Sequence, residues 1–278
     1  MNELTSAVES NVAAALAEDI GGGDWTAQLI PVAAAAGARV ITRDDAVVCG
    51  APWFDACFRR LDPAVQIDWA LTEGARAQAG QTLVHVRGKA RALLTGERTA
   101  LNFLQLLSAV ATLTQRYVEA VAGTGASIVD TRKTLPGLRL AQKYAVRMGG
   151  GTNHRIGLYD GVLIKENHIA AAGGIEAALR EAARVAPPGV WTQIEVENFA
   201  QLKAALAAGA KMILLDNMDT AQMREAVKIT AGRAQLEASG GVTLSTVRAI
   251  ALTGVDRISI GGLTKDVEAV DLSMRFED

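Results

Sequence analysis

The sequence is poor in the residues that build metal sites and disulfide frameworks. Its 278 residues include two cysteines and three histidines. Cys49 and Cys57 have no second cysteine pair and no histidine-rich tract beside them, which argues against a zinc site or a disulfide scaffold. We therefore expect two reduced thiols that pack as small apolar side chains, in a protein of the cytoplasm.

Neither sign of charge is in excess. The chain has 28 Lys and Arg against 30 Asp and Glu, a formal net charge of -2. This balance supplies no field that would attract nucleic acid or a membrane surface, so we expect neither as a partner. No uncharged apolar run approaches the length that crosses a bilayer, and residues 1–20 are acidic and amphipathic, unlike a targeting segment. With half of its residues hydrophobic, the chain is predicted to be a soluble, untargeted globular protein.

The pattern of predicted helices and strands changes along the chain, which indicates two domains. Up to about residue 94 a helix is expected near residues 6–18, and strands are expected in ARVITR, AVVCG, VQIDWAL and TLVHVRGKARALL. This mixture favours an α+β sandwich with an antiparallel sheet. Residues 95–123 then space apolar side chains as a long connecting helix does, with Thr95 as a candidate N-cap. We draw the domains at 1–115 and 116–278, with a C-terminal tail available to pack on the N-terminal domain.

The second half of the chain is regular. Six short apolar or β-branched runs each end in polar or glycine residues: ASIVDTRK, GVLIKENH, WTQIEVEN, KMILLDN, AQLEASGG and RISIGG. The steps from Glu195 to Asp216, Ser239 and Gly261 are 21, 23 and 22 residues, the size of a compact βα unit. Right-handed crossovers make such strands parallel, so their carboxyl ends share one edge. The pattern predicts an α/β barrel with its chemistry at that carboxyl edge.

Cations gather near the predicted carboxyl edge. The segment from Asp130 to Ile169 holds seven Lys and Arg against three acids, and two of the three histidines. The late glycine pairs of ASGG and SIGG fall where barrels often hold a phosphate, because glycine lets a ligand approach backbone N–H groups. Either pair alone is more simply a turn, but pairs at successive strand ends favour a phosphorylated ligand with several negative charges.

These motifs resemble a known family. The segment DTRKTLPGLRLAQKYAVRMGGGTNHRIGLYDGVLIKENH, with EDIGGGDWT, ERTALNFLQ, IEVEN, LLDNM, EASGGV and SIGGLT in order, is similar to the quinolinate phosphoribosyltransferase family from about Glu18 to Thr264. The resemblance implies an N-terminal α/β sandwich, an incomplete parallel α/β barrel, and a dimer or larger homo-oligomer. Trp25 and Glu166 depart from residues more usual in the family, and neither is assigned a role in the chemistry.

The resemblance also implies a reaction. It is the transfer of the phosphoribosyl group of 5-phosphoribosyl 1-diphosphate to quinolinate with decarboxylation, which gives nicotinate mononucleotide, diphosphate and carbon dioxide in de novo NAD biosynthesis and uses Mg²⁺. Such a pentosyltransferase must bind several anionic groups, for which Arg offers a two-pronged fork and Lys a point charge. The basic cluster is thereby predicted to be a substrate clamp.

The resemblance assigns the cationic and polar residues to substrates. Arg132, His154, Arg155 and Lys165 line the quinolinate side, Lys133 lies near the diphosphate, and Arg98 reaches in from a neighbouring subunit; Ser239, Gly241 and Gly261 bind phosphate, and Arg139 and Lys143 are second-tier candidates. The residues alone leave alternatives open. Arg139, Lys143 and Arg147 have the spacing of a solvated helix stripe, and Arg98 is equally a surface arginine beside Glu97.

Two carboxylates fit a different task. Glu195 and Asp216, at neighbouring strand ends, are predicted to bind magnesium and the ribose hydroxyls, and to stabilise the positive charge that develops as diphosphate leaves. Together with Lys133 and Lys165 they are the predicted catalytic residues. Taken singly, each carboxylate is as simply a cap of the following helix.

Three rival functions stay open at the level of the sequence. One is a relative with another acceptor, such as the protein found with molybdate-uptake genes, although TRKT, NHR and IKENH argue against it. Another is a barrel aldolase that uses Lys165 as a Schiff-base amine. The last is an anion-binding module without turnover.

Overall fold

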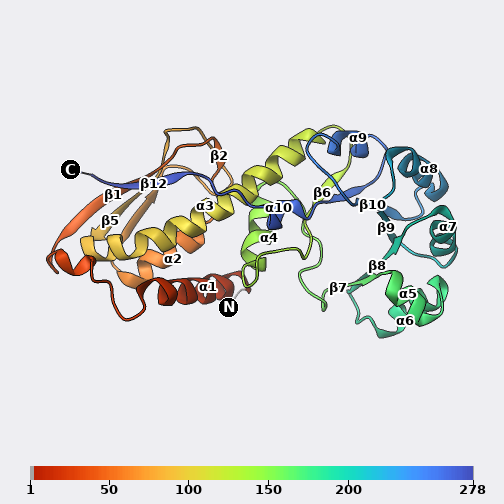
Figure 1. Ribbon diagram of the computed structural model, residues 1–278, viewed down its shortest axis with the longest axis horizontal. Coiled ribbons are helices and arrows are strands. Elements are labelled where there is room, and N and C mark those ends of the chain that lie inside the picture. The colour runs from red at the N-terminus through yellow and green to blue at the C-terminus, as the bar shows by residue number, and fades with distance from the viewer. Residues whose placement is uncertain (1–2, 278) are drawn as a thin grey trace. The chain divides into compact units, whose positions relative to one another are not determined.

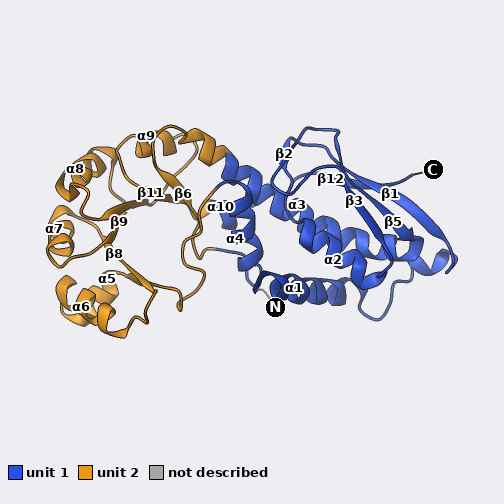
Figure 2. Cartoon of the chain, turned by 180° about the vertical axis from the view of Figure 1, so that it is seen from behind, with its two compact units in different colours: residues 1–115, 134–150, 263–278 blue, residues 116–133, 151–262 orange. Residues whose placement is uncertain are grey.

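A computed structural model describes residues 3–277, and the chain divides into two compact units (Figures 1 and 2). Unit 1 comprises residues 1–115, 134–150 and 263–278, and unit 2 comprises residues 116–133 and 151–262. The sequence-based boundary instead assigned residues 134–150 to the barrel domain, and it left the C-terminal tail available to pack on the N-terminal domain. Each unit has its own sheet and its own apolar core.

Unit 1 is built on a four-stranded antiparallel sheet in the order β12-β1-β5-β3. The strands are β1 (Ala35–Thr42), β3 (Gln66–Trp69), β5 (Thr82–Lys89) and β12 (Leu272–Glu277), and a separate pair joins β2 (Ala46–Val47) to β4 (Arg76–Ala77). Val40 and Val84 are fully buried, whereas the alternate residues Arg39 and Arg87 are exposed. One face of the sheet therefore packs into the core and the other carries charge.

Four longer helices complete unit 1. They are α1 (Glu3–Ile20), α2 (Ala51–Leu61), α3 (Ala90–Ala120, which ends within unit 2) and α4 (Arg139–Met148), with the short η1 (Ala27–Leu29) and α10 (Gly262–Lys265). Trp53, Phe54 and Phe58 of α2 are fully buried, and Leu101 and Leu104 of α3 join them in the core. The apolar stripe of α3 supplies the helical spacing seen in the sequence.

The sequence predictions for unit 1 are right about the class of fold and wrong at two places. The antiparallel sheet and the long helix are confirmed, but α3 starts at Ala90, inside the stretch predicted as a strand. Thr95 therefore lies within the helix and is not its N-cap; its hydroxyl donates to Asp24 Oδ2 at 2.8 Å. Helix α2 was not predicted at all.

Unit 2 is a curved, six-stranded parallel sheet in the order β6-β11-β10-β9-β8-β7. Its strands are β6 (Ser127–Val129), β7 (Gly161–Ile164), β8 (Trp191–Val196), β9 (Met212–Asp216), β10 (Gln235–Ser239) and β11 (Arg257–Ser259). Each of the six predicted runs contains one of these strands. β6 and β7 are the two edge strands, so the sheet forms an incomplete barrel, as expected.

The outer helices of unit 2 are α5 (Glu166–Ala172), α6 (Ile175–Val185), α7 (Phe199–Ala207), α8 (Thr220–Thr230) and α9 (Val247–Ala251). Figure 2 shows α6, α7, α8 and α9 around the outside of the strands. Ile194, Leu236 and Ile258 are buried beneath them, while the adjacent Glu195 and Glu237 point to the opposite, inner face. The inner face of the sheet therefore carries carboxylates.

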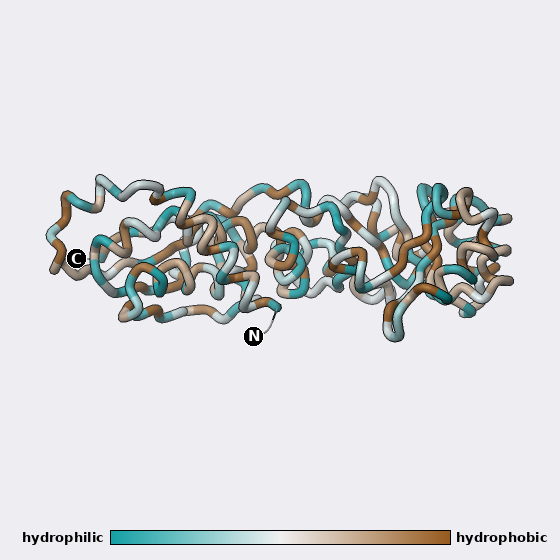
Figure 3. The backbone as a smooth tube through the Cα atoms, turned by 90° about the horizontal axis from the view of Figure 1, so that it is seen from below, coloured by the Kyte–Doolittle hydropathy of each residue, from teal (hydrophilic) through white to brown (hydrophobic). Residues whose placement is uncertain are grey.

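Hydropathy varies over short distances along the whole described chain. Brown and teal alternate every few residues along the trace in Figure 3. Within residues 3–277, no helix combines the length and the apolar content needed to cross a membrane.

Candidate active site

The predicted site residues of unit 2 collect at the carboxyl edge of its parallel sheet. Asp216 and Ser239 are the last residues of β9 and β10 and are direct partners in the sheet register. The others at this edge are Arg132 and Lys133 after β6, Lys165 after β7, Glu195 near the end of β8, and Gly241 and Gly261 after β10 and β11. Because all six strands are parallel, the fold brings residues that lie more than 120 positions apart in the sequence to one edge.

Asp130 ties two cationic segments together at this edge. It is fully buried just after β6, and its carboxylate accepts the His154 backbone N–H at 2.8 Å and Asn153 Nδ2 at 2.6 Å. This anchor holds the segment with Arg155 beside the segment with Arg132. Asp130 had no predicted role, although an acid that ends an apolar run and is followed by two cations is a usable sequence signal.

Arg132 and Arg155 lie close enough to influence each other. Burial lowers the pKa of Arg155, and the positive charge of Arg132 lowers it further, against the opposing effect of Asp160. One nitrogen of the Arg155 guanidinium is held in place, because Nη1 donates to the Gly161 carbonyl oxygen at 2.9 Å. Two neighbouring guanidinium groups that repel each other are stabilised by a ligand with two negative charges.

A carboxylate and an ammonium face each other across β7 and β8. Lys165 Nζ lies 4.0 Å from Glu195 Oε2, and the Glu195 side chain is largely buried. Burial raises the pKa of Glu195; Lys165 counteracts this, and Asp216 adds to it. His168 holds the turn that presents the lysine, because its Nδ1 accepts the Lys165 backbone N–H at 3.0 Å.

Glu195 and Asp216 together fit a magnesium ion. Magnesium keeps several waters and is bound through one or two carboxylates plus substrate phosphates. The negative charge of Asp216 raises the pKa of Glu195, so the Asp216 carboxylate lies within electrostatic reach of Glu195. Within residues 3–277 no group of three or more His, Cys, Asp and Glu is arranged to hold a metal alone.

The glycines that follow β10 and β11 differ in backbone conformation and in the space around them. Gly240 has φ +105°, and a Cβ there would collide with Asn217 Oδ1; Gly241 has φ +60° with open space around it. A Cβ on Gly261 would lie 2.9 Å from Lys133 Cδ, so the lysine stem lies directly over this turn. Gly241 is therefore the turn residue whose backbone is open to a phosphate, whereas Lys133 covers Gly261.

Three predicted residues lie in unit 1. Arg98 is an exposed residue of α3, and Arg139 opens α4, where its Nε donates to Thr134 Oγ1 at 3.1 Å. Lys143, one turn further along α4, is only 2% exposed. The interpretation of Arg139, Lys143 and Arg147 as a solvated stripe is therefore wrong for Lys143, whereas Arg147 is exposed.

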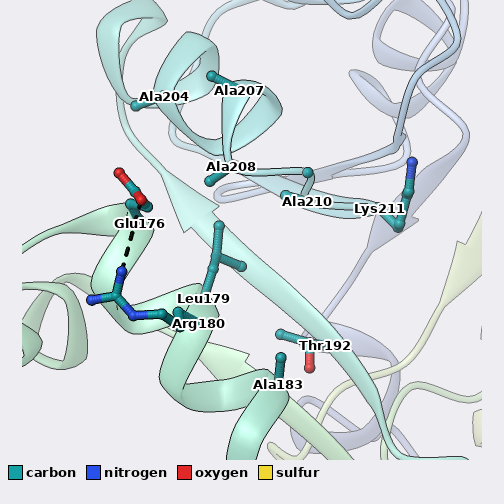
Figure 4. Close-up of a pocket in the computed structure, with 11 residues that line it drawn as sticks. Glu176, Leu179, Arg180, Ala183, Thr192, Ala204, Ala207, Ala208, Ala210 and Lys211 are labelled. Carbon is teal, nitrogen blue, oxygen red and sulfur yellow. Dashed lines mark ion pairs between the residues drawn. The ribbon is translucent and has the colours of Figure 1, made fainter.

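A hollow on the outside of unit 2 is unrelated to this chemistry. It has a volume of about 970 Å³ and lies between α6 and α7, with Leu179, Arg180 and Lys211 among its lining residues (Figure 4). Lys211 precedes β9, so the hollow reaches the amino ends of the strands, opposite to Asp216. The Arg180 guanidinium is paired with Glu176 at 3.7 Å, and the remaining lining residues are mostly alanine.

The fold and the site together define a class of protein. A parallel α/β barrel whose carboxyl edge carries clustered cations, two carboxylates and glycine turns is typical of an enzyme for phosphorylated, multiply anionic substrates. Family models narrow this class. The model described as quinolinate phosphoribosyl transferase, N-terminal domain, matches residues 24–108, and that of the C-terminal domain matches residues 110–275.

Known relatives are similar to this chain over almost their full length. The nicotinate-nucleotide pyrophosphorylase (carboxylating) of Mycobacterium leprae is 43% identical over 278 residues, which cover 96% of each chain. A probable nicotinate-nucleotide pyrophosphorylase (carboxylating) of Bacillus subtilis is 43% identical over 257 residues, 92% of this chain and 89% of the relative. The structure of the nicotinate-nucleotide pyrophosphorylase from Francisella tularensis has a TM-score of 0.95 and 41% identity, with all of both chains covered. The chain belongs to the quinolinate phosphoribosyltransferase family, whose activity is a decarboxylating phosphoribosyl transfer in NAD biosynthesis.

Proposed function

We propose that the chain binds quinolinate and 5-phosphoribosyl 1-diphosphate at the carboxyl edge of its parallel sheet and forms nicotinate mononucleotide, diphosphate and carbon dioxide there. The observation that carries this proposal is the Arg132–Arg155 pair. Quinolinate has two adjacent carboxylates, and two guanidinium groups within electrostatic reach of each other match them in number and charge. Lys165 adds a third cation at the same edge.

The phosphoribosyl donor belongs on the glycine side of this edge. Lys133 lies over Gly261 and is positioned to meet a diphosphate, while Ser239 and the Gly240–Gly241 turn offer a hydroxyl and backbone N–H groups to the 5-phosphate. The nitrogen of the quinolinate ring then attacks C1 of the ribose as the bond from C1 to the diphosphate oxygen breaks. In this step the arginine pair would hold the quinolinate ring in line with the breaking bond, and the glycine side of the edge would hold the donor.

Glu195 and Asp216 act on the charge that develops in the ribose. As the diphosphate leaves, the ribose ring becomes oxocarbenium-like, and two fixed carboxylates stabilise that positive charge without reorganising. Both carboxylates, with the ribose hydroxyls, are also the groups that would hold magnesium. Bound magnesium would neutralise negative charge on the departing diphosphate.

Decarboxylation needs little further chemistry from the protein. The ring nitrogen is cationic once it carries the ribose, so loss of the adjacent carboxylate as carbon dioxide leaves a carbanion that this charge stabilises before it takes up a proton. The protein's part is to hold the ring in place and to exclude water from it.

A comparison of two acceptors tests the proposed function. Quinolinate should be used roughly a hundredfold better than nicotinate or more, because nicotinate leaves one cation of the clamp without its carboxylate. The measurement is nicotinate mononucleotide formed from each acid with 5-phosphoribosyl 1-diphosphate. Comparable turnover of nicotinate would exclude the carboxylating assignment and favour a relative with another acceptor.

The aldolase alternative fits Lys165 less well. A Schiff-base lysine is activated by an apolar pocket or by a neighbouring cation. The Lys165 side chain is instead about half exposed, and its nearest charged partner is the Glu195 carboxylate at 4.0 Å. We expect borohydride to trap no carbonyl substrate on the chain.

Removal of divalent metal is expected to abolish turnover. Without magnesium the charge of the leaving diphosphate is not neutralised, although the quinolinate clamp stays intact. Activity should fall to background in excess chelator and return with added Mg²⁺, while calorimetry should detect quinolinate binding in both conditions. Full activity in excess chelator would remove magnesium from the mechanism.

The glycine turn after β10 is expected to serve the phosphoribosyl donor alone. Gly241→Ala places a side chain at φ +60°, where L residues are strained by about 1 kcal/mol or more, and directs a methyl group toward the phosphate. Calorimetry should show weaker binding of 5-phosphoribosyl 1-diphosphate and unchanged binding of quinolinate.

Gly232→Ala is the matched control for the glycine turn. Gly232 has φ +73°, also in open space, but follows α8, away from the carboxyl edge. It should reproduce the strain without the loss of affinity. Equal losses of both ligands in Gly241→Ala, with the fold intact, would move the phosphate away from this turn.

We also propose that the active site is completed by a second copy of the chain. Arg98 is exposed on α3 and is one of the cations that the resemblance assigns to the site of a neighbouring subunit. A homodimer with two shared sites is the simplest closed assembly that makes this exchange reciprocal.

A further inference from the structure

The ring of His154 has a defined partner on each nitrogen. Nδ1 accepts the backbone N–H of Arg155 at 2.8 Å, and Nε2 lies 3.0 Å from Gln193 Oε1. A backbone N–H only donates, so Nδ1 carries no hydrogen. The ring is therefore the neutral tautomer with its hydrogen on Nε2, and it donates to Gln193.

Gln193 connects the His154 ring to a buried ion pair. Its Nε2 donates to Glu237 Oε2 at 3.2 Å, and Arg257 Nε donates to the same oxygen at 3.1 Å. Gln193 and Glu237 are each 1% exposed. The amide of Gln193 has one consistent orientation, oxygen toward the histidine and nitrogen toward the carboxylate. The network crosses the inside of the barrel through β8, β10 and β11.

The other contacts of the ring lead to Arg155. The His154 ring packs edge-on against Trp191, with the ring centroids 5.0 Å apart. Trp191 in turn covers Gly161, where a Cβ would lie 2.6 Å from its ring. The carbonyl oxygen of Gly161 is the acceptor of the Arg155 guanidinium. Arg155 is thus held through its backbone by the imidazole and through its side chain by the strand that Trp191 packs against.

We propose that a buried network of Gln193, Glu237 and Arg257 fixes the tautomer and orientation of the His154 ring, which thereby acts as a positioning residue. Its effect on quinolinate is exerted through Arg155. This inference rests on the proposed function only for the role of Arg155 as a quinolinate clamp.

Nitrogen NMR of the histidine rings is the direct test. The chain has three histidines, so a His154→Asn variant assigns the His154 signals by their loss. In free wild-type protein, Nε2 should carry the hydrogen and Nδ1 should behave as an unprotonated acceptor. Addition of quinolinate should leave this pattern unchanged. An imidazolium paired with Glu237, whose Oε1 lies 3.7 Å from Nε2, or a transfer of the Nε2–H bond to quinolinate, would overturn the proposal.

A variant of the network tests its function. Gln193→Leu removes the acceptor of the ring hydrogen, so the His154 signals should show a mixture of tautomers. Binding of quinolinate should weaken about tenfold, the scale of one hydrogen bond, and binding of 5-phosphoribosyl 1-diphosphate should change less than about twofold. Gln235→Leu, an exposed glutamine at the start of β10, is the matched control and should change neither.

The two proposals fail in distinguishable ways. If wild-type protein does not turn over quinolinate, the proposed function fails, whereas the tautomer in the free protein is measured independently of activity. If Gln193→Leu folds with the wild-type His154 pattern and unchanged quinolinate binding, the network does no positioning and the inference is wrong. If Gln193→Leu does not fold, the wild-type tautomer and its response to quinolinate decide.

Discussion

Replacement of Arg155 or Arg132 by alanine is expected to lower kcat/KM for quinolinate by about 30-fold to several thousand-fold, which corresponds to about 2 to 5 kcal/mol. The physical reason is that truncation leaves a substrate carboxylate desolvated without its partner. The loss should be far larger for quinolinate than for 5-phosphoribosyl 1-diphosphate, because we propose that both arginines bind the acceptor. Initial rates with one substrate varied and the other saturating give both values.

Arg180→Ala is the matched control for the two clamp arginines. Arg180 lies on α6 in the same unit, its side chain is 72% exposed, and it pairs with Glu176 in solvent. Such a pair contributes at most about 1 kcal/mol to stability, and its removal should leave kcat/KM unchanged. If the losses for Arg132→Ala and Arg155→Ala stay within the range of this control, the pair does not bind the acceptor and the clamp is placed wrongly.

Much of the barrel was predictable because its strands are short, apolar and regularly spaced. Each run ends where a polar residue or a glycine interrupts the buried sequence, as Asp216 ends β9 and Ser239 ends β10. Parallel strands then force these ends onto one edge, so predicting the strands also predicts which residues meet. The location of the cationic edge follows from the same regularity.

The N-terminal unit was harder because its local signals conflict. TLVHVRGK alternates as a strand does, but the residues that follow, ARALL, are strong helix formers, and the chain switches at Ala90. Helix α2 begins Ala-Pro-Trp-Phe after Gly50, a composition also typical of turns and strands. What makes it a helix is the burial of Trp53, Phe54, Cys57 and Phe58 on one face, which is a tertiary effect.

The buried network was also missed, and the sequence did contain a signal for it. Gln193 precedes the buried Ile194 in β8, and Glu237 lies between the buried Leu236 and Ala238 in β10. A polar side chain inside such a strand must find a partner within the protein. Which partner it finds depends on the curvature and register of the sheet, because Glu237 is level with Arg257 on the adjacent strand. No spacing along the chain encodes that pairing.

Two inactive variants are expected to restore activity to each other when they are produced in the same cell. If each site combines Arg98 of one chain with Lys165 of its partner, a mixed dimer of Arg98→Ala and Lys165→Ala chains has one site with both substitutions and one site with neither. Random assortment makes about half of the dimers mixed, and half of their sites are intact. Co-expressed chains should therefore recover about a quarter of wild-type activity.

The matched control for this experiment pairs two substitutions from the same side of the site. Lys165 and Glu195 face each other within unit 2 of one chain, so a mixed dimer of Lys165→Ala and Glu195→Ala chains carries one substitution in every site and should stay inactive. Differently tagged chains establish how many mixed dimers form. If verified mixed dimers of Arg98→Ala and Lys165→Ala are as inactive as either parent, Arg98 serves its own chain or no site, because a reciprocal exchange of Arg98 between subunits necessarily leaves one of the two sites intact.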